Sequence, residues 1–163
     1  MINISSQLGN LALEMELDIK EGKLTSLLIS DKKYISTATV SSENEVNHMQ
    51  VKGIQHKLKH YFLTATAISS VALLPRGTSF QKSVWNELCK IPLGETRTYG
   101  EIAKKLNSSA RAVGNACRKN PIAIIIPCHR VVSATGIGGY AGKTGGKQLA
   151  IKRWLLNHEG VNL

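Results

Sequence analysis

One short segment of the chain brings together a thiol, an imidazole and a guanidinium: Pro127-Cys128-His129-Arg130. A thiol becomes a strong nucleophile only after it loses its proton, and a nearby imidazole or cation promotes that loss. Pro127 restricts the backbone directly before the cysteine, so the sulfur is expected to be held rigidly. These residue types indicate chemistry in which a cysteine attacks an electrophilic carbon. A buried, inert cysteine is the simpler interpretation of a lone thiol and stays open at this point.

The other cysteines and histidines give weaker signals. Cys89 and Cys117 lie in helical patterns and are expected to be small core or pocket-lining residues. No Cys-x-x-Cys pair is present, which disfavours a zinc knuckle or a thioredoxin-like couple. His56 and His60 are one helical turn apart, but no third ligand is evident, so a surface helix is favoured over a metal site. Without a secretion signal the three thiols are expected to be reduced, and no metal is expected.

The charge of the chain is concentrated in one half. The 163 residues include 21 Lys and Arg against 11 Asp and Glu, a net charge of +10. Residues 1–75 hold seven bases and seven acids, so residues 76–163 carry the whole excess, 14 bases against 4 acids. This asymmetry favours a polyanionic partner over a merely solubilising surface. With 42% hydrophobic residues the chain can bury a core, but no apolar run approaches the roughly 20 residues that span a bilayer.

The first half is predicted to be a small α+β unit. Residues 11–19 alternate apolar and polar side chains, which is typical of a half-buried strand. A turn at 21–23 and a second strand at 24–29 predict a hairpin. Apolar residues at helical spacing predict a helix over 46–63, and residues 64–79 are expected to form a connection.

The second half is predicted to be mostly helical. Helices are expected over 79–90, 99–106 and 110–119, the second beginning with a capping box of Thr98 and Glu101. Two short helices separated by about three residues form a helix-turn-helix pattern.

The segment around Cys128 follows these helices. The apolar run 122–126 predicts a strand buried on both faces, with Cys128 at its end. A glycine-rich loop over 136–146 and a final helix over 148–156 complete the pattern. The predicted fold class is therefore α/β (α+β), with a small N-terminal sheet-and-helix domain (1–75) and a helical C-terminal domain containing a helix-turn-helix (76–163).

The segment Ile126-Pro127-Cys128-His129-Arg130-Val131 resembles the active-site signature of the O6-alkylguanine-DNA alkyltransferases. Further motifs follow in that family's order and at nearly its spacing: Gly77-Thr-Ser-Phe-Gln81, Ile91-Pro-Leu-Gly-Glu95, Thr98-Tyr-Gly-Glu-Ile-Ala103, Arg111-Ala-Val-Gly114, Asn120-Pro121 and Trp154-Leu-Leu-Asn-His-Glu159. The resemblance is strong over about residues 76–160. Before that only the outline of strands and helix agrees, and the family implies a ribonuclease H-like fold there.

The resemblance implies that Cys128 accepts an alkyl group from O6 of guanine in an irreversible displacement. Each molecule would act once, and no cofactor would be needed. His129 and Glu159 match the family's partners of this cysteine, joined to it through a water. Asn120 matches the residue that ties the second helix to the cysteine segment.

The resemblance also implies a DNA-binding surface. The target base must leave the duplex, because a thiol cannot reach O6 within the stack. The second helix of the helix-turn-helix would enter the minor groove, with Arg111 filling the gap left by the base and Tyr99 guiding the nucleotide. The remaining residues implied to contact DNA are Ser109, Ala110, Ala112, Gly114, Asn115 and Arg118.

A guanine pocket follows from the same resemblance. Tyr140 would wall it, the Ala141 N–H would donate to O6, and the Cys128 and Val131 carbonyls would accept from the exocyclic amine. This chain departs from the family pattern by several extra residues around Lys143–Gln148. Those residues leave open which bulky alkyl groups the pocket accepts.

The expected partner is double-stranded DNA carrying O6-alkylguanine, and O4-alkylthymine as a second lesion. We expect a cytoplasmic, nucleoid-associated monomer with no membrane contact.

Three alternatives are an alkyltransferase-like damage sensor, a helix-turn-helix regulator and a cysteine hydrolase. A sensor would lack the acceptor thiol, and a regulator would need bulkier reading side chains than this alanine- and glycine-rich helix carries. A hydrolase would leave the basic half unexplained.

Overall fold

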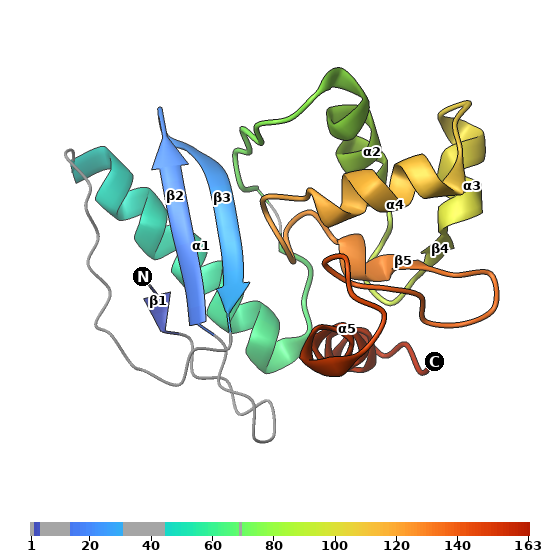
Figure 1. Cartoon of the computed structure of the whole chain (residues 1–163). Coiled ribbons are helices and arrows are strands. Elements are labelled where there is room, and N and C mark those ends of the chain that lie inside the picture. Colours follow the sequence, from blue (N-terminus) through green and yellow to red (C-terminus); the bar gives the residue numbers. More distant parts are fainter. Residues whose placement is uncertain (1, 4–13, 31–44, 69) are drawn as a thin grey trace. The chain divides into compact units, whose positions relative to one another are not determined.

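The computed structural model of the chain describes residues 2–3, 14–30, 45–68 and 70–163 (Figure 1). Contacts within the chain divide it into two compact units, Met1–Arg76 and Gly77–Leu163. Among the described residues no helix is long and apolar enough to cross a bilayer.

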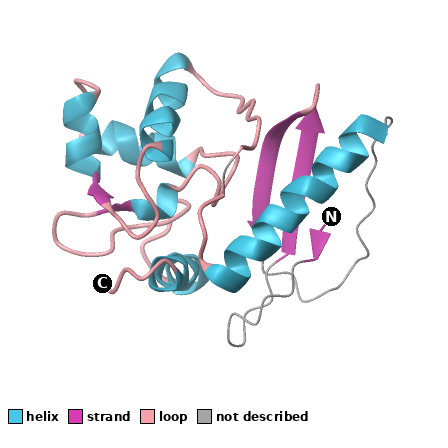
Figure 2. Cartoon of the chain, turned by 180° about the vertical axis from the view of Figure 1, so that it is seen from behind, coloured by secondary structure: helices cyan, strands magenta, loops and turns pink. Residues whose placement is uncertain are grey.

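The first unit is an antiparallel sheet with one long helix. Its strands are β1 (Ile2–Asn3), β2 (Glu14–Lys20) and β3 (Lys23–Ser30), in that order, and α1 (Glu45–Thr64) lies across one face of the sheet (Figures 1 and 2). The turn between β2 and β3 places both Glu21 and Gly22 at positive φ, 51° and 71°. The predicted hairpin and helix are confirmed, although residues 11–13 of the expected first strand lie outside the described residues.

The second unit consists of helices and one small parallel sheet. Its helices are α2 (Ser79–Cys89), α3 (Tyr99–Lys105), α4 (Ala110–Arg118) and α5 (Gly146–His158). Strand β4 (Arg97–Thr98) pairs in parallel with β5 (Val131–Val132), so the start of α3 lies beside the segment that follows Cys128. The largest apolar side chains of its core are those of Trp85, Leu88, Ile102, Ile122, Ile126 and Leu155.

Side-chain caps explain where the helix-turn-helix begins and turns. Thr98 Oγ1 accepts from the Glu101 N–H at 3.1 Å, while the Glu101 carboxylate accepts from the Thr98 N–H at 2.6 Å, which is the expected capping box. Ser109 caps α4 by accepting from the Ala112 N–H at 3.2 Å. Between the helices Asn107 adopts a left-handed φ of 48°, which asparagine tolerates well.

The sequence-based prediction of a strand over 122–126 is wrong. This segment is a compact turn in which the Ile126 N–H donates to the Ile122 carbonyl at 2.9 Å, and Ile124 has a φ of 69°. The side chain of Asn120 supplies the polar partners that a neighbouring strand would have offered, because it accepts from the Ile122 N–H and donates to the Ile126 carbonyl. Three of its four isoleucines, Ile122, Ile124 and Ile126, are still buried, so apolar composition alone cannot distinguish this turn from a strand.

The cysteine therefore lies in a short 3-10 turn, Cys128–Arg130, and not at the end of a strand. The glycine-rich stretch after β5 is a loop, as predicted. Helix α5 is longer at both ends than the predicted 148–156.

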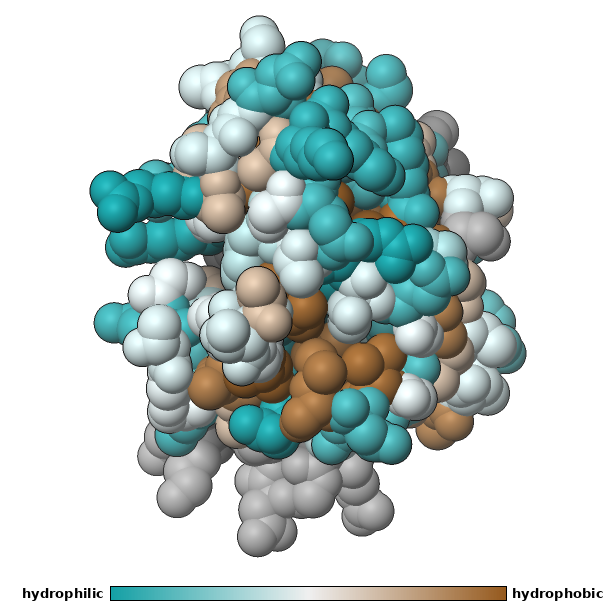
Figure 3. All heavy atoms as spheres, turned by 90° about the vertical axis from the view of Figure 1, so that its right-hand side faces the viewer, coloured by the Kyte–Doolittle hydropathy of each residue, from teal (hydrophilic) through white to brown (hydrophobic). Residues whose placement is uncertain are grey.

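The charge of the second unit lies almost entirely on its surface. Of its basic residues only Arg130 and Lys152 are buried. Figure 3 shows a face on which hydrophilic side chains cover most of the upper half, with a hydrophobic area below. Exposed cations in excess create a long-range field that attracts a polyanion.

Replacing Thr98 by alanine should lower the free energy of unfolding by about 1 kcal/mol, because the capping box at the start of α3 is lost. Both tryptophans of the chain, Trp85 and Trp154, lie in this unit, so urea unfolding followed by tryptophan fluorescence measures the change. Thr96→Ala, two residues earlier and not a cap, is the control. Equal stability of the Thr98→Ala variant and the wild type would show that the cap contributes nothing.

Candidate active site

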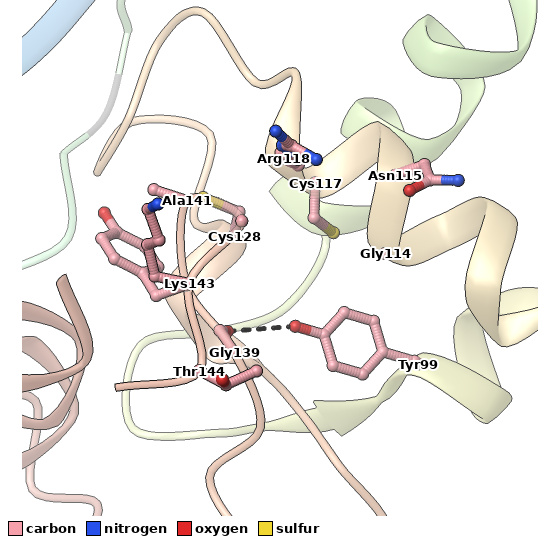
Figure 4. A pocket seen from close by; sticks show the side chains of 12 residues that line it. Tyr99, Gly114, Asn115, Cys117, Arg118, Cys128, Gly139, Ala141, Lys143 and Thr144 are labelled. Atoms are coloured by element: carbon pink, nitrogen blue, oxygen red, sulfur yellow. Dashed lines mark hydrogen bonds between the residues drawn. The ribbon is translucent and has the colours of Figure 1, made fainter. Parts of the chain in front are cut away.

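Cys128 lies at a pocket of about 260 Å³ in the second unit (Figure 4). The residue is only 8% exposed, and Asn120 Nδ2 donates to its Sγ at 3.2 Å. Burial raises the pKa of the Cys128 thiol, while the Asn120 hydrogen bond and the charge of Lys152 act in the opposite direction. Because burial dominates, the resting thiol keeps its proton and needs a base to become a nucleophile.

His129, the next residue, is fully buried and bonded to a carboxylate. Its Nε2 lies 2.9 Å from Glu159 Oε1, and neither side chain is exposed. Burial lowers the pKa of His129 more than Glu159 raises it, so the imidazole is neutral at pH 7. Its Nε2 must then carry the proton donated to Glu159, which leaves Nδ1 as an acceptor. That Nδ1 is buried and has no hydrogen-bond partner among the described residues.

Arg130 holds the same carboxylate from the other side. Its Nε donates to Glu159 Oε2 at 2.8 Å and its Nη2 to Oε1 at 2.9 Å, while Nη1 donates to the Ile91 carbonyl at 2.7 Å. Burial alone would raise the pKa of Glu159, but hydrogen bonds from His129 and Arg130 outweigh it and hold this pKa well below its ordinary value. The guanidinium of Arg130, two residues after Cys128 in the sequence, therefore orients the Glu159 carboxylate.

Sequence reasoning missed Lys152. This lysine of α5 is fully buried, and its Nζ donates to the backbone carbonyls of Val131 and Ile137 at 2.6 Å and of Gly139 at 2.9 Å. Burial lowers the pKa of Lys152 to about 8. The sequence did carry a signal for its burial. Lys152 is four residues from both Gln148 and Leu156, on the helix face that also carries Leu155. The ammonium joins the glycine-rich loop to the strand that follows Cys128.

Tyr99 also lines the pocket. Its hydroxyl donates to the Gly139 carbonyl at 3.2 Å. Its ring lies against two glycines: a Cβ on Gly114 would be 3.9 Å from a ring carbon, and a Cβ on Gly138 would be 3.2 Å from one. Burial raises the pKa of Tyr99 to about 12, so the phenol stays protonated and can donate.

The glycine-rich loop forms the rest of the wall. Tyr140 is buried there, and Ala141 follows it with a left-handed φ of 48°. The Ala141 N–H takes part in no backbone hydrogen bond among the described residues. The carbonyl of Val131 accepts from Lys152 but has a second lone pair for another donor.

Helix α4 presents one exposed face and one buried face. Residues 110, 111, 114, 115 and 118 lie on the accessible face at helical spacing, whereas Val113, Ala116 and Cys117 are buried. The Trp85 indole donates to the Ala116 carbonyl at 3.0 Å and so ties α4 to α2. The small side chains of the accessible face leave the helix backbone close to the surface.

The pocket brings together some of the expected residues and not others. Its described lining includes Tyr99, Gly114, Asn115, Arg118, Cys128, Tyr140 and Ala141. His129 and Glu159 are buried and do not line it, and Ser109, Ala110, Arg111 and Ala112 lie outside it on α4. Cys117 lines the pocket as expected, but Cys89 is exposed, contrary to the prediction of a core or lining residue. His56 and His60 are both exposed on α1.

Fold and site together define a helix-turn-helix protein with a buried cysteine at a pocket and, next in the chain, a buried histidine bonded to a carboxylate. Residues 79–161 match the model of the 6-O-methylguanine DNA methyltransferase DNA-binding domain. The chain belongs to this family.

The chain is also similar to individual proteins of this family. A methylated-DNA–protein-cysteine methyltransferase of Methanosarcina mazei is 51% identical over 113 residues, 68% of each chain. A crystal structure of a variant of the Mycobacterium tuberculosis O6-methylguanine methyltransferase has a TM-score of 0.75 and 37% identity, covering 99% of this chain and 92% of that one. The structure of Mycobacterium tuberculosis OGT in complex with DNA has a TM-score of 0.67 and 36% identity, covering 89% and 85%.

The stability of the protein should fall as the pH drops below about 6.5, the ordinary histidine pKa. The folded-state pKa of His129 is lowered, so the unfolded chain takes up a proton that the folded one does not. Between pH 6.5 and 5 this should cost up to about 2 kcal/mol, and Glu159 adds a further loss below about pH 4.5.

Urea unfolding at pH 7.5, 6 and 5 measures this slope. His129→Gln keeps a donor for Glu159 but does not titrate, so its stability should lack the step between pH 6.5 and 5. The same pH dependence in both proteins would mean that His129 is not the group responsible.

Proposed function

We propose that this protein repairs duplex DNA by transferring the alkyl group of O6-alkylguanine to Cys128, once per molecule. The observation that carries the proposal is that Cys128 lines a pocket and is followed in the chain by His129 and Arg130, which form a buried network with Glu159. The guanine would occupy that pocket with its alkyl group toward Sγ. A soft thiolate in a water-poor site suits displacement at a saturated carbon.

The proton of Cys128 would leave first. The buried Nδ1 of His129 is the acceptor with no other partner among the described residues, and one water between it and Sγ would carry the proton. Glu159 stabilises the imidazolium that forms, because it is already ionised and bonded to Nε2. Arg130 keeps the carboxylate fixed and charged throughout.

The thiolate then attacks the alkyl carbon from the side opposite O6. A C–S bond forms while the C–O bond breaks, and the electron pair of that bond goes to O6. The Ala141 N–H would donate to this oxygen, and the Tyr99 hydroxyl, still protonated, could donate to the purine ring. The released guanine gains a proton, and the thioether left on Cys128 has no leaving group that another thiolate could displace readily.

Access to a base within a duplex requires that the nucleotide be extruded. The accessible face of α4 would enter the minor groove, where the small residues Ala110 and Gly114, with Ala112 at the edge of this face, allow close approach. Arg111 would fill the gap in the stack, and Ser109, Asn115 and Arg118 would contact the backbone. O4-alkylthymine would be a second substrate, and the protein would act as a monomer.

Mixing the protein with a duplex that contains O6-methylguanine should add the mass of one CH₂ unit to a peptide that contains Cys128. Intact-mass and peptide mass spectrometry measure the transfer. Cys128→Ala should remove it completely and keep duplex binding, whereas Cys117→Ala, in the same pocket, should keep the transfer. Methyl transfer to Cys89 or Cys117 in the wild type would overturn the acceptor assignment.

Arg111→Ala should slow repair of a duplex lesion by about 10- to 100-fold, because nothing then fills the gap that the extruded base leaves, a loss of a few kcal/mol in unstacking. Reaction with free O6-benzylguanine needs no extrusion and should change less than about twofold. Single-turnover rates on both substrates measure the difference. Equal losses on the two substrates would exclude the proposed role of Arg111.

A further inference from the structure

A tight turn in the glycine-rich loop places an additional cation at the mouth of the pocket. The Tyr140 N–H donates to the Lys143 carbonyl at 2.8 Å, and the Lys143 N–H donates to the Tyr140 carbonyl at 2.9 Å. The two residues between them, Ala141 and Gly142, have positive φ of 48° and 78°, which defines a type I′ turn. Because both hydrogen bonds close this turn, the start of the inserted stretch is a rigid part of the pocket wall.

The turn lies directly against Arg118 of α4. A Cβ on Gly142 would be 2.6 Å from Arg118 Nε and 2.8 Å from its Cδ, so the Arg118 side chain packs closely over the glycine of this turn. Arg118 and Lys143 thus come from segments far apart in the sequence but line the same pocket as Cys128 (Figure 4). Thr144 follows on the same lining and adds a hydroxyl donor.

Both cations are exposed and available to an anion. Neither Arg118 nor Lys143 forms an ion pair within the part of the chain that the structure describes. None of the twelve described lining residues is acidic. Two unpaired cations at a pocket mouth without a carboxylate suit an anionic group next to whatever enters the pocket.

We propose that Lys143 and Arg118 form a phosphodiester-binding pair at this mouth, with Lys143 holding a phosphate beside the alkylated nucleotide. The inference rests on the proposed function, since an extruded nucleotide carries a phosphate on each side of its sugar. An ammonium bonded to a phosphate oxygen is a strong, charge-assisted contact. The extra residues of this loop would then favour a lesion within a DNA strand over the same modified base free in solution.

The experiment compares Lys143→Gln with Lys147→Gln, which removes the same charge from the same inserted stretch but outside the pocket lining. Single-turnover rates are measured on a duplex with O6-methylguanine and on free O6-benzylguanine. Lys143→Gln should slow the duplex reaction about tenfold, as expected for one charge-assisted contact, and should change the free-base reaction less than about twofold. The slope of the logarithm of the duplex binding constant against the logarithm of the salt concentration should fall by about one, which corresponds to one counterion fewer released on binding. Lys147→Gln should change the duplex rate less than about twofold.

Two further duplexes identify the phosphate, each with a neutral methylphosphonate on one side of the lesion. On one of these duplexes the wild type should react as slowly as Lys143→Gln does on the unmodified duplex. Lys143→Gln should react no more slowly there than on the unmodified duplex, because the methylphosphonate and the substitution remove the same contact. Three outcomes would each overturn the proposal. The first is an equal loss of duplex rate in Lys143→Gln and Lys147→Gln, and the second is that Lys143→Gln still reacts about tenfold more slowly than the wild type on both modified duplexes. The third is that Lys143→Gln loses as much rate on free O6-benzylguanine as on the duplex. A wild-type protein that gains no methyl group would instead refute the proposed function itself.

Discussion

The burial of Cys128 is the constraint on which the rest of the site depends, because the proposed reaction requires this thiol to lose its proton. A thiolate is costly away from water, and Cys128 is almost fully enclosed. The imidazole of His129, which we propose as the base, is buried as well, and its Nδ1 has no hydrogen-bond partner among the described residues. Glu159 makes this arrangement possible because it is held ionised by a bidentate contact from Arg130 while it orients His129. A carboxylate shared by a histidine and an arginine stays charged whether or not the imidazole has taken up a proton.

The pocket wall is built from loops, and one buried cation organises it. The Lys152 ammonium donates to three backbone carbonyls, one in β5 and two in the glycine-rich loop. The Gly139 carbonyl receives both the Lys152 ammonium and the Tyr99 hydroxyl, so it connects α5, the loop and the start of α3. Loops that carry function usually need such tertiary anchors, since they lack a ladder of backbone hydrogen bonds.

The two faces of α4 have different tasks. Its buried face is fixed by apolar packing and by the hydrogen bond from Trp85, which gives the exposed face a defined position beside the pocket. Its exposed face carries few large side chains, which suits close approach to a regular surface better than the reading of base edges. The same helix reaches the pocket through Gly114, Cys117 and Arg118, so its exposed face and the pocket of Cys128 share one element.

The sequence by itself determined the helices of the second unit and the capping box of α3, and it singled out the segment around Cys128, whose reactivity stays a prediction. Caps and helical periodicity depend on residues a few positions apart, which is why Thr98 and Glu101 could be assigned correctly. The run 122–126 could not, because buried apolar residues have no period that separates a strand from a turn, and the decisive partner is the side chain of Asn120. The roles of Arg130 and Lys152 were also decided only by the tertiary structure. A charged residue becomes a buried anchor when distant carbonyls or a carboxylate surround it, and that encounter is a property of the folded chain.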